Sequence, residues 1–194
     1  MAEEKKEGLL GSVKAGIISA IRGVREITDA VVDTVSGSLV NAIRRTGAIG
    51  AALTSAVSET VRGAIEGAAE VGADIGKASK GTMIGVLRGS KEVGAEAMDA
   101  ISTAASTAVE SAARVGADVA ATAKAAVEGA IEGAKEVGVS VEEAASEAAS
   151  AAIEGAGKVS ATAVEQVRKA VTGTISGVKV ILKEPFKGEE KEKK

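Results

Sequence analysis

The chain has 194 residues, a formal net charge of -3, and no His, Cys, Trp or Tyr. Without His and Cys it lacks the commonest general base, the thiolate nucleophile and the usual nitrogen and sulfur ligands of metals, so we expect no catalytic residue, no cofactor and no metal site. The negative charge and an aromatic content of 1% also argue against nucleic-acid binding. The composition favours a non-enzymatic protein without a small-molecule substrate.

Residues 1–8 mix acidic and basic side chains, and we expect them to form a charged tail before the first helix. The segment GLLGSVKAGIISAIRGV that follows resembles short helices that lie on membrane surfaces, and a larger core contact near the end of a bundle explains it equally well. No uninterrupted apolar stretch approaches the roughly 20 residues needed to cross a bilayer. We therefore expect neither a secretory signal nor a membrane span, and a location in the cytoplasm or at a membrane surface.

Residues 9–183 carry an 11-residue period that is doubled to 22. Aliphatic residues recur, without insertion or deletion, in a first column of Ile21, Ile43, Ile65, Leu87, Val109, Ile131, Ile153 and Ile175 and a second of Ile27, Ile49, Val71, Val93, Val115, Val137, Val159 and Ile181. Eleven residues make three helical turns at about 98° per residue, so this period predicts helix. The single proline, Pro185, falls where the period ends, inside a charged tail of residues 184–194.

These patterns predict an all-α protein built from one long, essentially continuous amphipathic helix, roughly 260 Å long if unbroken. A helical hairpin or a coiled-coil bundle stays open as an alternative, because Gly76, Gly81, Gly85 and Gly89 form a cluster where the chain could turn. A turn would normally add or remove residues. The register is kept across this cluster, which favours the continuous helix.

On a helical wheel at this angle both columns fall on one apolar face. A basic column flanks that face and consists of Lys14, Arg25, Lys80, Lys91, Lys124, Lys135, Arg168 and Lys179. Most acidic side chains lie on the opposite side. This arrangement is typical of helices that lie on anionic lipid, and it is equally typical of a solvated face with Glu and Lys four residues apart.

Glycine also recurs, although each glycine costs about 1 kcal/mol relative to Ala inside a helix. Gly50, Gly72, Gly94, Gly116 and Gly138 are spaced by 22 residues. Other glycines form pairs four residues apart, namely Gly63 with Gly67, Gly85 with Gly89, Gly129 with Gly133 and Gly173 with Gly177. We interpret both sets as sites where helices approach closely, with repeat duplication of a tolerated residue as the alternative.

The segments VEGAIEGAKEVG and AIEGAGKVSATAVEQV resemble the 11-residue lipid-binding repeats of synucleins and perilipins. The chain lacks the synuclein hexamer Lys-Thr-Lys-Glu-Gly-Val, so the resemblance does not imply descent. The chain is also similar to uncharacterised bacterial hendecad-repeat proteins, which imply no activity. Late-embryogenesis proteins share the period but are strongly hydrophilic, whereas the mean hydropathy of this chain is +0.18.

Our leading functional hypothesis is a peripheral protein whose amphipathic helix coats a membrane or another apolar surface, with anionic lipid as its partner. The alternative is a self-assembling coiled-coil scaffold or filament, a homo-oligomer that packs through its Gly, Ala, Val and Ile faces. A stress-protective disordered chain is a third reading. The first two follow from one fact, that an isolated Gly-rich helix is marginal in water and needs a partner for its apolar face.

Overall fold

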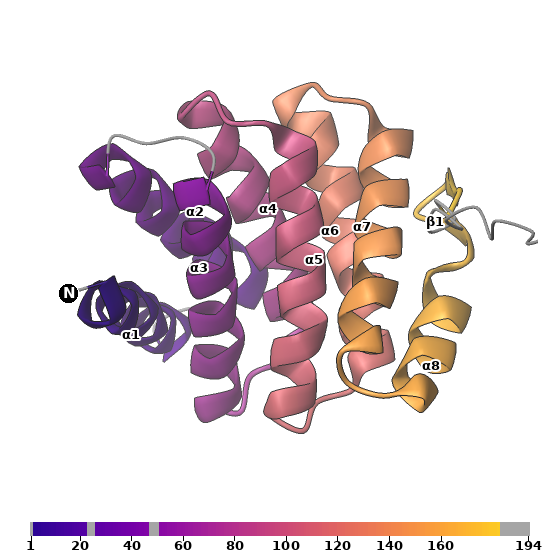
Figure 1. Cartoon of the computed structure of the whole chain (residues 1–194), viewed down its shortest axis with the longest axis horizontal. Helices are drawn as coiled ribbons and strands as arrows, with labels where there is room; N and C mark the ends of the chain where they lie inside the picture. The colour runs from indigo at the N-terminus through magenta and orange to yellow at the C-terminus, as the bar shows by residue number, and fades with distance from the viewer. Residues whose placement is uncertain (1, 23–25, 47–50, 183–194) are drawn as a thin grey trace, which may run out of the picture.

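The computed structural model describes residues 2–22, 26–46 and 51–182, which fold into eight helices and a short hairpin (Figure 1). The elements are α1 (Ala2–Arg22), α2 (Ile27–Thr46), α3 (Ala51–Glu70), α4 (Ile75–Glu92), α5 (Ala97–Arg114), α6 (Val119–Val137), α7 (Val141–Gly157), α8 (Ala161–Val171), β1 (Gly173–Ile175) and β2 (Val178–Val180). The predicted all-α class is confirmed, whereas the single continuous helix is wrong. The last helix ends at Val171 rather than near Lys183, and α1 begins at Ala2, inside the segment predicted as a tail.

The turns from α3 to α7 are built by a repeated local signal. Gly72, Gly94, Gly116 and Gly138 have φ angles of 67°, 70°, 73° and 77°, the left-handed conformation in which glycine commonly ends a helix. After the first of these glycines, the Ala73 amide donates to the Ala68 carbonyl at 2.9 Å. Asp74 then caps the next helix by accepting a hydrogen bond from the Lys77 amide at 2.9 Å. These glycines therefore end helices, and the prediction that they line helix contacts is wrong.

The register is kept across each turn because turn and helix together have the length of one repeat. Helix α4 has 18 residues, and the four residues 93–96 separate it from α5, so the unit is 22 residues long. The turns add nothing to the period and remove nothing from it. The glycine cluster at residues 76–89 lies inside α4 and is neither a hinge nor a turn.

The helices form a two-layer solenoid. The chain reverses direction at each turn, so helices two apart in the sequence run parallel and pack side by side. One layer contains α1, α3, α5 and α7, and the other contains α2, α4, α6 and α8. We call these the odd layer and the even layer. In Figure 1 the odd helices α3, α5 and α7 lie in front of α4 and α6, with α1 and α2 at one end and α8 with the hairpin at the other.

A core of small aliphatic side chains fills the space between the layers. Ile65, Leu87 and Ile131 are its larger members, and alanines such as Ala105 and Ala149 occupy much of the rest. The hairpin closes one end, where Val180 is buried and the Ile181 amide donates to Ser146 Oγ at 3.1 Å. None of the described helices is long and apolar enough to cross a membrane.

Candidate functional surfaces

The predicted apolar face lies inside the solenoid. Its first column is buried at Ile43, Ile65, Leu87, Val109, Ile131 and Ile175 and half-buried at Ile21 and Ile153. The described residues of the second column, up to Val159, lie at or near helix ends, so they are less buried. They are half-buried at Ile27, Val71, Val93 and Val115, buried at Val137 and exposed at Val159. Ile49 lies outside the described residues. Among the described large apolar side chains, only Val159 and Ile181 are exposed, so the described part of the surface presents no apolar face.

Most of the predicted packing glycines lie between helices of the same layer. A Cβ atom on Gly63 would stand 2.8 Å from the Leu10 carbonyl oxygen, and one on Gly67 would stand 2.9 Å from that of Lys14. These contacts join α1 to α3. Such distances are shorter than real Cβ contacts, so only glycine lets the two backbones come this close.

The same arrangement recurs in the even layer. A Cβ on Gly85 would lie 2.7 Å from the Val32 carbonyl oxygen, and one on Gly89 would lie 3.2 Å from that of Ser36, at the α2–α4 contact. A Cβ on Gly129 would lie 2.5 Å from the Lys80 carbonyl oxygen at the α4–α6 contact. Gly133 follows one turn later, where a Cβ would meet Leu87 Cδ1 at 2.6 Å.

The pair Gly173 and Gly177 was predicted wrongly as a helix contact. Both residues belong to the hairpin, with φ angles of 108° and 81°, and a Cβ on either would meet nothing within 4 Å. Gly177 lies in the turn between the strands, and Gly173 begins β1 opposite Val180; both have the positive φ that favours glycine.

Basic side chains of the predicted flank form ion pairs between helices of one layer. Lys14 Nζ lies 2.6 Å from Glu70 Oε2, and Lys80 Nζ lies 2.6 Å from Glu132 Oε2. The hydrogen bond to Glu70, together with the negative charge of that carboxylate, raises the pKa of Lys14. Lys91 donates instead to the Val137 carbonyl at 2.7 Å, at the end of α6. Lys124, Lys135, Arg168 and Lys179 are exposed, and Arg25 lies outside the described residues.

Four further ion pairs, which the wheel did not indicate, join helices two apart at a spacing of 48 residues. They are Arg44 with Glu92 at 2.9 Å, Arg88 with Glu136 at 2.6 Å, Glu66 with Arg114 at 3.6 Å and Glu110 with Lys158 at 2.8 Å. The hydrogen bond that Arg88 donates to Glu136 raises the pKa of the guanidinium. The separation of 48 residues equals two repeats plus about one helical turn. A search of the sequence for opposite charges 48 residues apart would have found these pairs.

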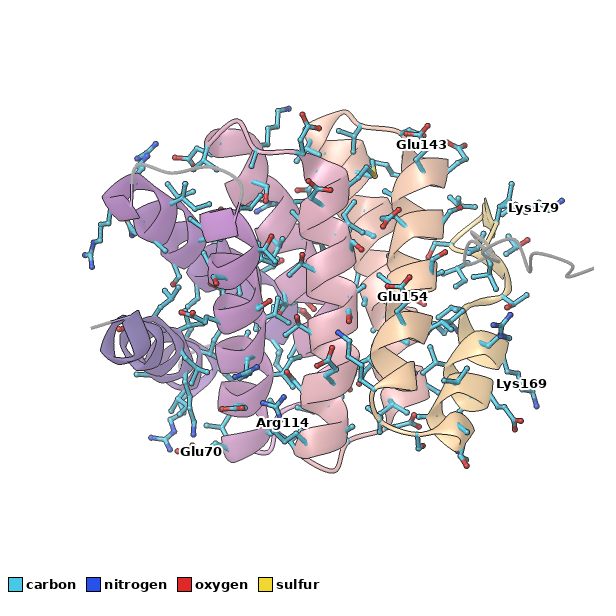
Figure 2. The ribbon with its side chains drawn as sticks, in the orientation of Figure 1. Glu70, Arg114, Glu143, Glu154, Lys169 and Lys179 are labelled. Carbon is cyan, nitrogen blue, oxygen red and sulfur yellow. The ribbon has the colours of Figure 1, made fainter. Side chains whose placement is uncertain are left out.

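The two layers differ in charge. Helices α3, α5 and α7 carry nine acidic and two basic side chains, a net charge of -7, whereas α4, α6 and α8 carry five acidic and eight basic ones, a net charge of +3. Figure 2 shows Glu143 and Glu154 along α7 in the odd layer and Lys169 projecting from α8. The wheel of a single helix could not show this difference, because it superimposes all the helices.

Open hollows lie at helix ends on the described surface. One, of about 430 Å³, lies between the turns that follow α4 and α6 and is lined by Met98 and Glu143 among others. The second, of about 620 Å³, lies between the start of α6 and α8 and is bordered by Ala120, Gln166 and Lys169. Within the described residues no three potential metal ligands come together.

Comparison with known proteins supports the fold alone. No known protein family matches the chain, and no curated protein sequence matches it significantly. Among solved structures, the crystal structure of a de novo designed helical repeat protein is similar to this chain, with a TM-score of 0.53 and 23% sequence identity, covering 86% of this chain and 91% of the designed one. The likeness agrees with a helical-repeat architecture.

Proposed function

We propose that this chain is a non-enzymatic peripheral protein that coats a membrane or another apolar surface by opening its solenoid into a continuous amphipathic helix. In the closed molecule the helices cover one another's apolar faces. The observation that carries the proposal is the 22-residue length of helix plus turn. That length corresponds to about six complete helical turns at about 98° per residue.

Because of this length, a turn can become helical without changing the phase of the helices on either side. If residues 93–96 become helical, α4 and α5 join, and Leu87 and Val109 point to the same side. The side chains that fill the closed core would then form one apolar stripe along the chain. The same residues can therefore be buried in the solenoid or against lipid.

The composition of the core also supports opening. Larger aliphatic side chains contribute about 1.5–3 kcal/mol each when buried, and alanine, which occupies many core positions here, contributes less. Opening on an apolar surface replaces one apolar environment by another. The free energy that resists opening is then mainly that of the specific packing between helices.

Opening would also release basic side chains beside the apolar stripe. Lys80 and Glu132 form an ion pair in the solenoid although they are 52 residues apart in the sequence. On a continuous helix they would be separated by roughly 80 Å. Lys80 would then be available to a phosphate headgroup, as would Lys14, whose partner Glu70 is similarly distant.

The alternative, self-assembly through the Gly, Ala, Val and Ile faces, would use residues that already form contacts between helices within one molecule. We also do not expect closed molecules to stack end to end through α2, the first helix of the even layer. Asn41 and Arg45 are exposed on α2 at the repeat positions that Gly85 and Gly89 occupy on α4. A further helix could not approach α2 there as closely as α2 approaches α4.

The turn glycines provide the test. We expect the variant Gly94→Ala with Gly116→Ala to favour the open form, because Ala in the left-handed conformation costs about 1–2 kcal/mol per site in the closed form. In a continuous helix, Ala is better than Gly by about 1 kcal/mol. Small-angle scattering should show a longer particle when lipid is present, and binding to vesicles of phosphatidylglycerol with phosphatidylcholine should tighten by at least tenfold.

The matched control is Gly11→Ala with Gly37→Ala, at exposed positions inside α1 and α2 where a Cβ meets nothing within 4 Å. These substitutions favour helix equally in both forms, so they should leave vesicle affinity nearly unchanged. Absence of vesicle binding by the parent and by both variants would contradict the proposal. So would an open turn variant that binds no better than the parent.

A further inference from the structure

We infer that the closed molecule docks on an anionic lipid surface through the outer face of its even layer, before it opens. This inference rests on the proposed function, and it names the face and the headgroup charge that start the process. The geometry points to a row of three lysines, one on each of three neighbouring even helices. They are Lys77 on α4, Lys124 on α6 and Lys169 on α8.

The helix contacts place these lysines in one row. Gly76, next to Lys77, has Ala125 as a neighbour, because a Cβ on Gly76 would lie 3.9 Å from that of Ala125. Lys124 precedes Ala125 in α6. One turn earlier in α6, Ala120 borders the same surface hollow as Lys169. The three lysines thus lie on neighbouring stretches of α4, α6 and α8, and each side chain is exposed.

These lysines are available for an external partner. All three are exposed, and none forms an ion pair with a described residue. Three of the five acids on α4, α6 and α8 form ion pairs, among them Glu132 with Lys80 and Glu136 with Arg88. The other two, Glu128 and Glu165, form none with a described residue. The positive charge left over on this face is the part that can bind phosphate headgroups.

The opposite layer sets the orientation. The net charge of -7 on α3, α5 and α7 is repelled by an anionic surface, while the +3 on α4, α6 and α8 is attracted. The molecule as a whole is slightly negative, so its net charge alone would not bring it to such a surface. Attraction therefore depends on presenting one layer, and it acts before any apolar contact because the closed surface exposes almost no large apolar side chain.

A lipid surface fits this face better than nucleic acid. Glu128, Glu132 and Glu136 stand among the lysines of α6, and the chain has almost no aromatic side chains for base stacking. A fluid membrane can move anionic lipids toward the lysines and away from the glutamates. The rigid, evenly spaced phosphates of a duplex cannot.

The test compares three variants with the parent. The first is Lys77→Gln with Lys124→Gln and Lys169→Gln. The second neutralises exposed odd-layer acids by Asp99→Asn, Glu142→Gln and Glu154→Gln, and the third combines all six changes and so restores the net charge of the parent. Binding to vesicles of phosphatidylglycerol with phosphatidylcholine is measured by cosedimentation, and far-UV circular dichroism checks that each variant folds like the parent.

We expect the lysine variant to bind about 100-fold more weakly than the parent, because each lysine near an anionic surface contributes roughly a factor of five. The six-site variant should stay at least tenfold weaker than the parent. Recovery of full affinity by the six-site variant would mean that net charge matters rather than the even face, and would overturn the inference while leaving the proposed function in place.

Two further arms separate the other outcomes. Equal binding of the parent to phosphatidylcholine alone and to the anionic vesicles would overturn docking by charge without touching the proposed function. Binding to duplex DNA as tight as to anionic vesicles, lost in the lysine variant, would assign the face to nucleic acid and overturn the inference. If the parent binds no vesicle of either kind, the proposed function itself fails.

Discussion

The α4–α6 contact and the α3–α5 contact occupy equivalent places in the two layers, but different residues build them. Helix α6 presents Gly129 and Gly133 to α4, and its backbone approaches so closely that a Cβ at Gly129 would clash with the Lys80 carbonyl at 2.5 Å. At the same repeat positions α5 presents Thr107 and Ser111. The repeat is thus regular in its apolar columns and irregular in the residues that join neighbouring helices of a layer.

The α3–α5 contact is less extensive, and its polar groups are poorly matched. Thr107 Oγ1 reaches Ser58 Oγ only at 3.4 Å. Ser111 Oγ and Arg62 Nε are buried without a hydrogen-bond partner among the described residues, which carries a desolvation penalty. The comparison indicates that parallel helices approach most closely here where glycine is present, and we expect a polar side chain in its place to weaken the contact.

Transferring the residues of α5 onto α6 should have the largest effect. In the variant Gly129→Thr with Gly133→Ser, the new side chains would collide with the backbone and side chains of α4. We expect the free energy of unfolding to fall by about 3 kcal/mol or more. Urea denaturation followed by circular dichroism measures this change.

The control for this transfer is Gly37→Ser, at an exposed position in α2 with no neighbour within 4 Å of a Cβ. Serine is a slightly better helix former than glycine, so we expect stabilisation by at most about 0.5 kcal/mol. A transfer variant as stable as this control would show that the glycine contacts do not hold the even layer together.

Removing a buried hydroxyl from α5 should strengthen the weaker contact. The variant Ser111→Ala deletes the unpaired oxygen and should raise the free energy of unfolding by about 1–2 kcal/mol. Ser55→Ala, at an exposed site in α3, gains only the helix preference of Ala, about 0.5 kcal/mol. Equal gains in both variants, measured by urea denaturation, would mean that the buried hydroxyl costs nothing.

The ion pairs should show the smallest effect. Glu110→Gln removes the 2.8 Å pair between α5 and Lys158, the residue that follows α7, and we expect a loss of less than about 1 kcal/mol because the Lys158 side chain is 64% exposed. Glu66→Gln removes the longer 3.6 Å pair with Arg114 across α3 and α5, and should cost less still. Both losses should vanish in about 1 M salt. A loss that persists there would indicate a packing role for the glutamate.

The helical class and the side of the helices that forms the core could be predicted from the sequence. The 22-residue columns identified the helical period, and the residues placed on the apolar face, such as Ile65 and Leu87, form the core. Glycines four residues apart, such as Gly63 and Gly67, lie at close helix contacts. These features depend on local periodicity and on side-chain size, which the sequence states directly.

The turns were missed although their signal is present. The sequence pattern predicts Gly94 and Gly116 at helix contacts, because a glycine that faces a helix cannot be distinguished in a sequence from one that ends a helix. An acid or serine two residues later, as at Asp118, marks the start of the next helix. A repeat of two 11-residue units keeps its helical phase through a turn, so periodicity by itself cannot distinguish a straight helix from a folded one.

The sequence by itself determined that the chain is helical, which residues share its apolar side and where backbones can approach closely. Only the tertiary structure decided that this side is buried within the chain, because its burial depends on the packing of the odd layer against the even layer around residues such as Leu87 and Ile131. It also sorted the charges into an acidic and a basic layer. The chain reverses at each turn, which places consecutive helices in different layers. A local sequence pattern does not show which helices will share a layer.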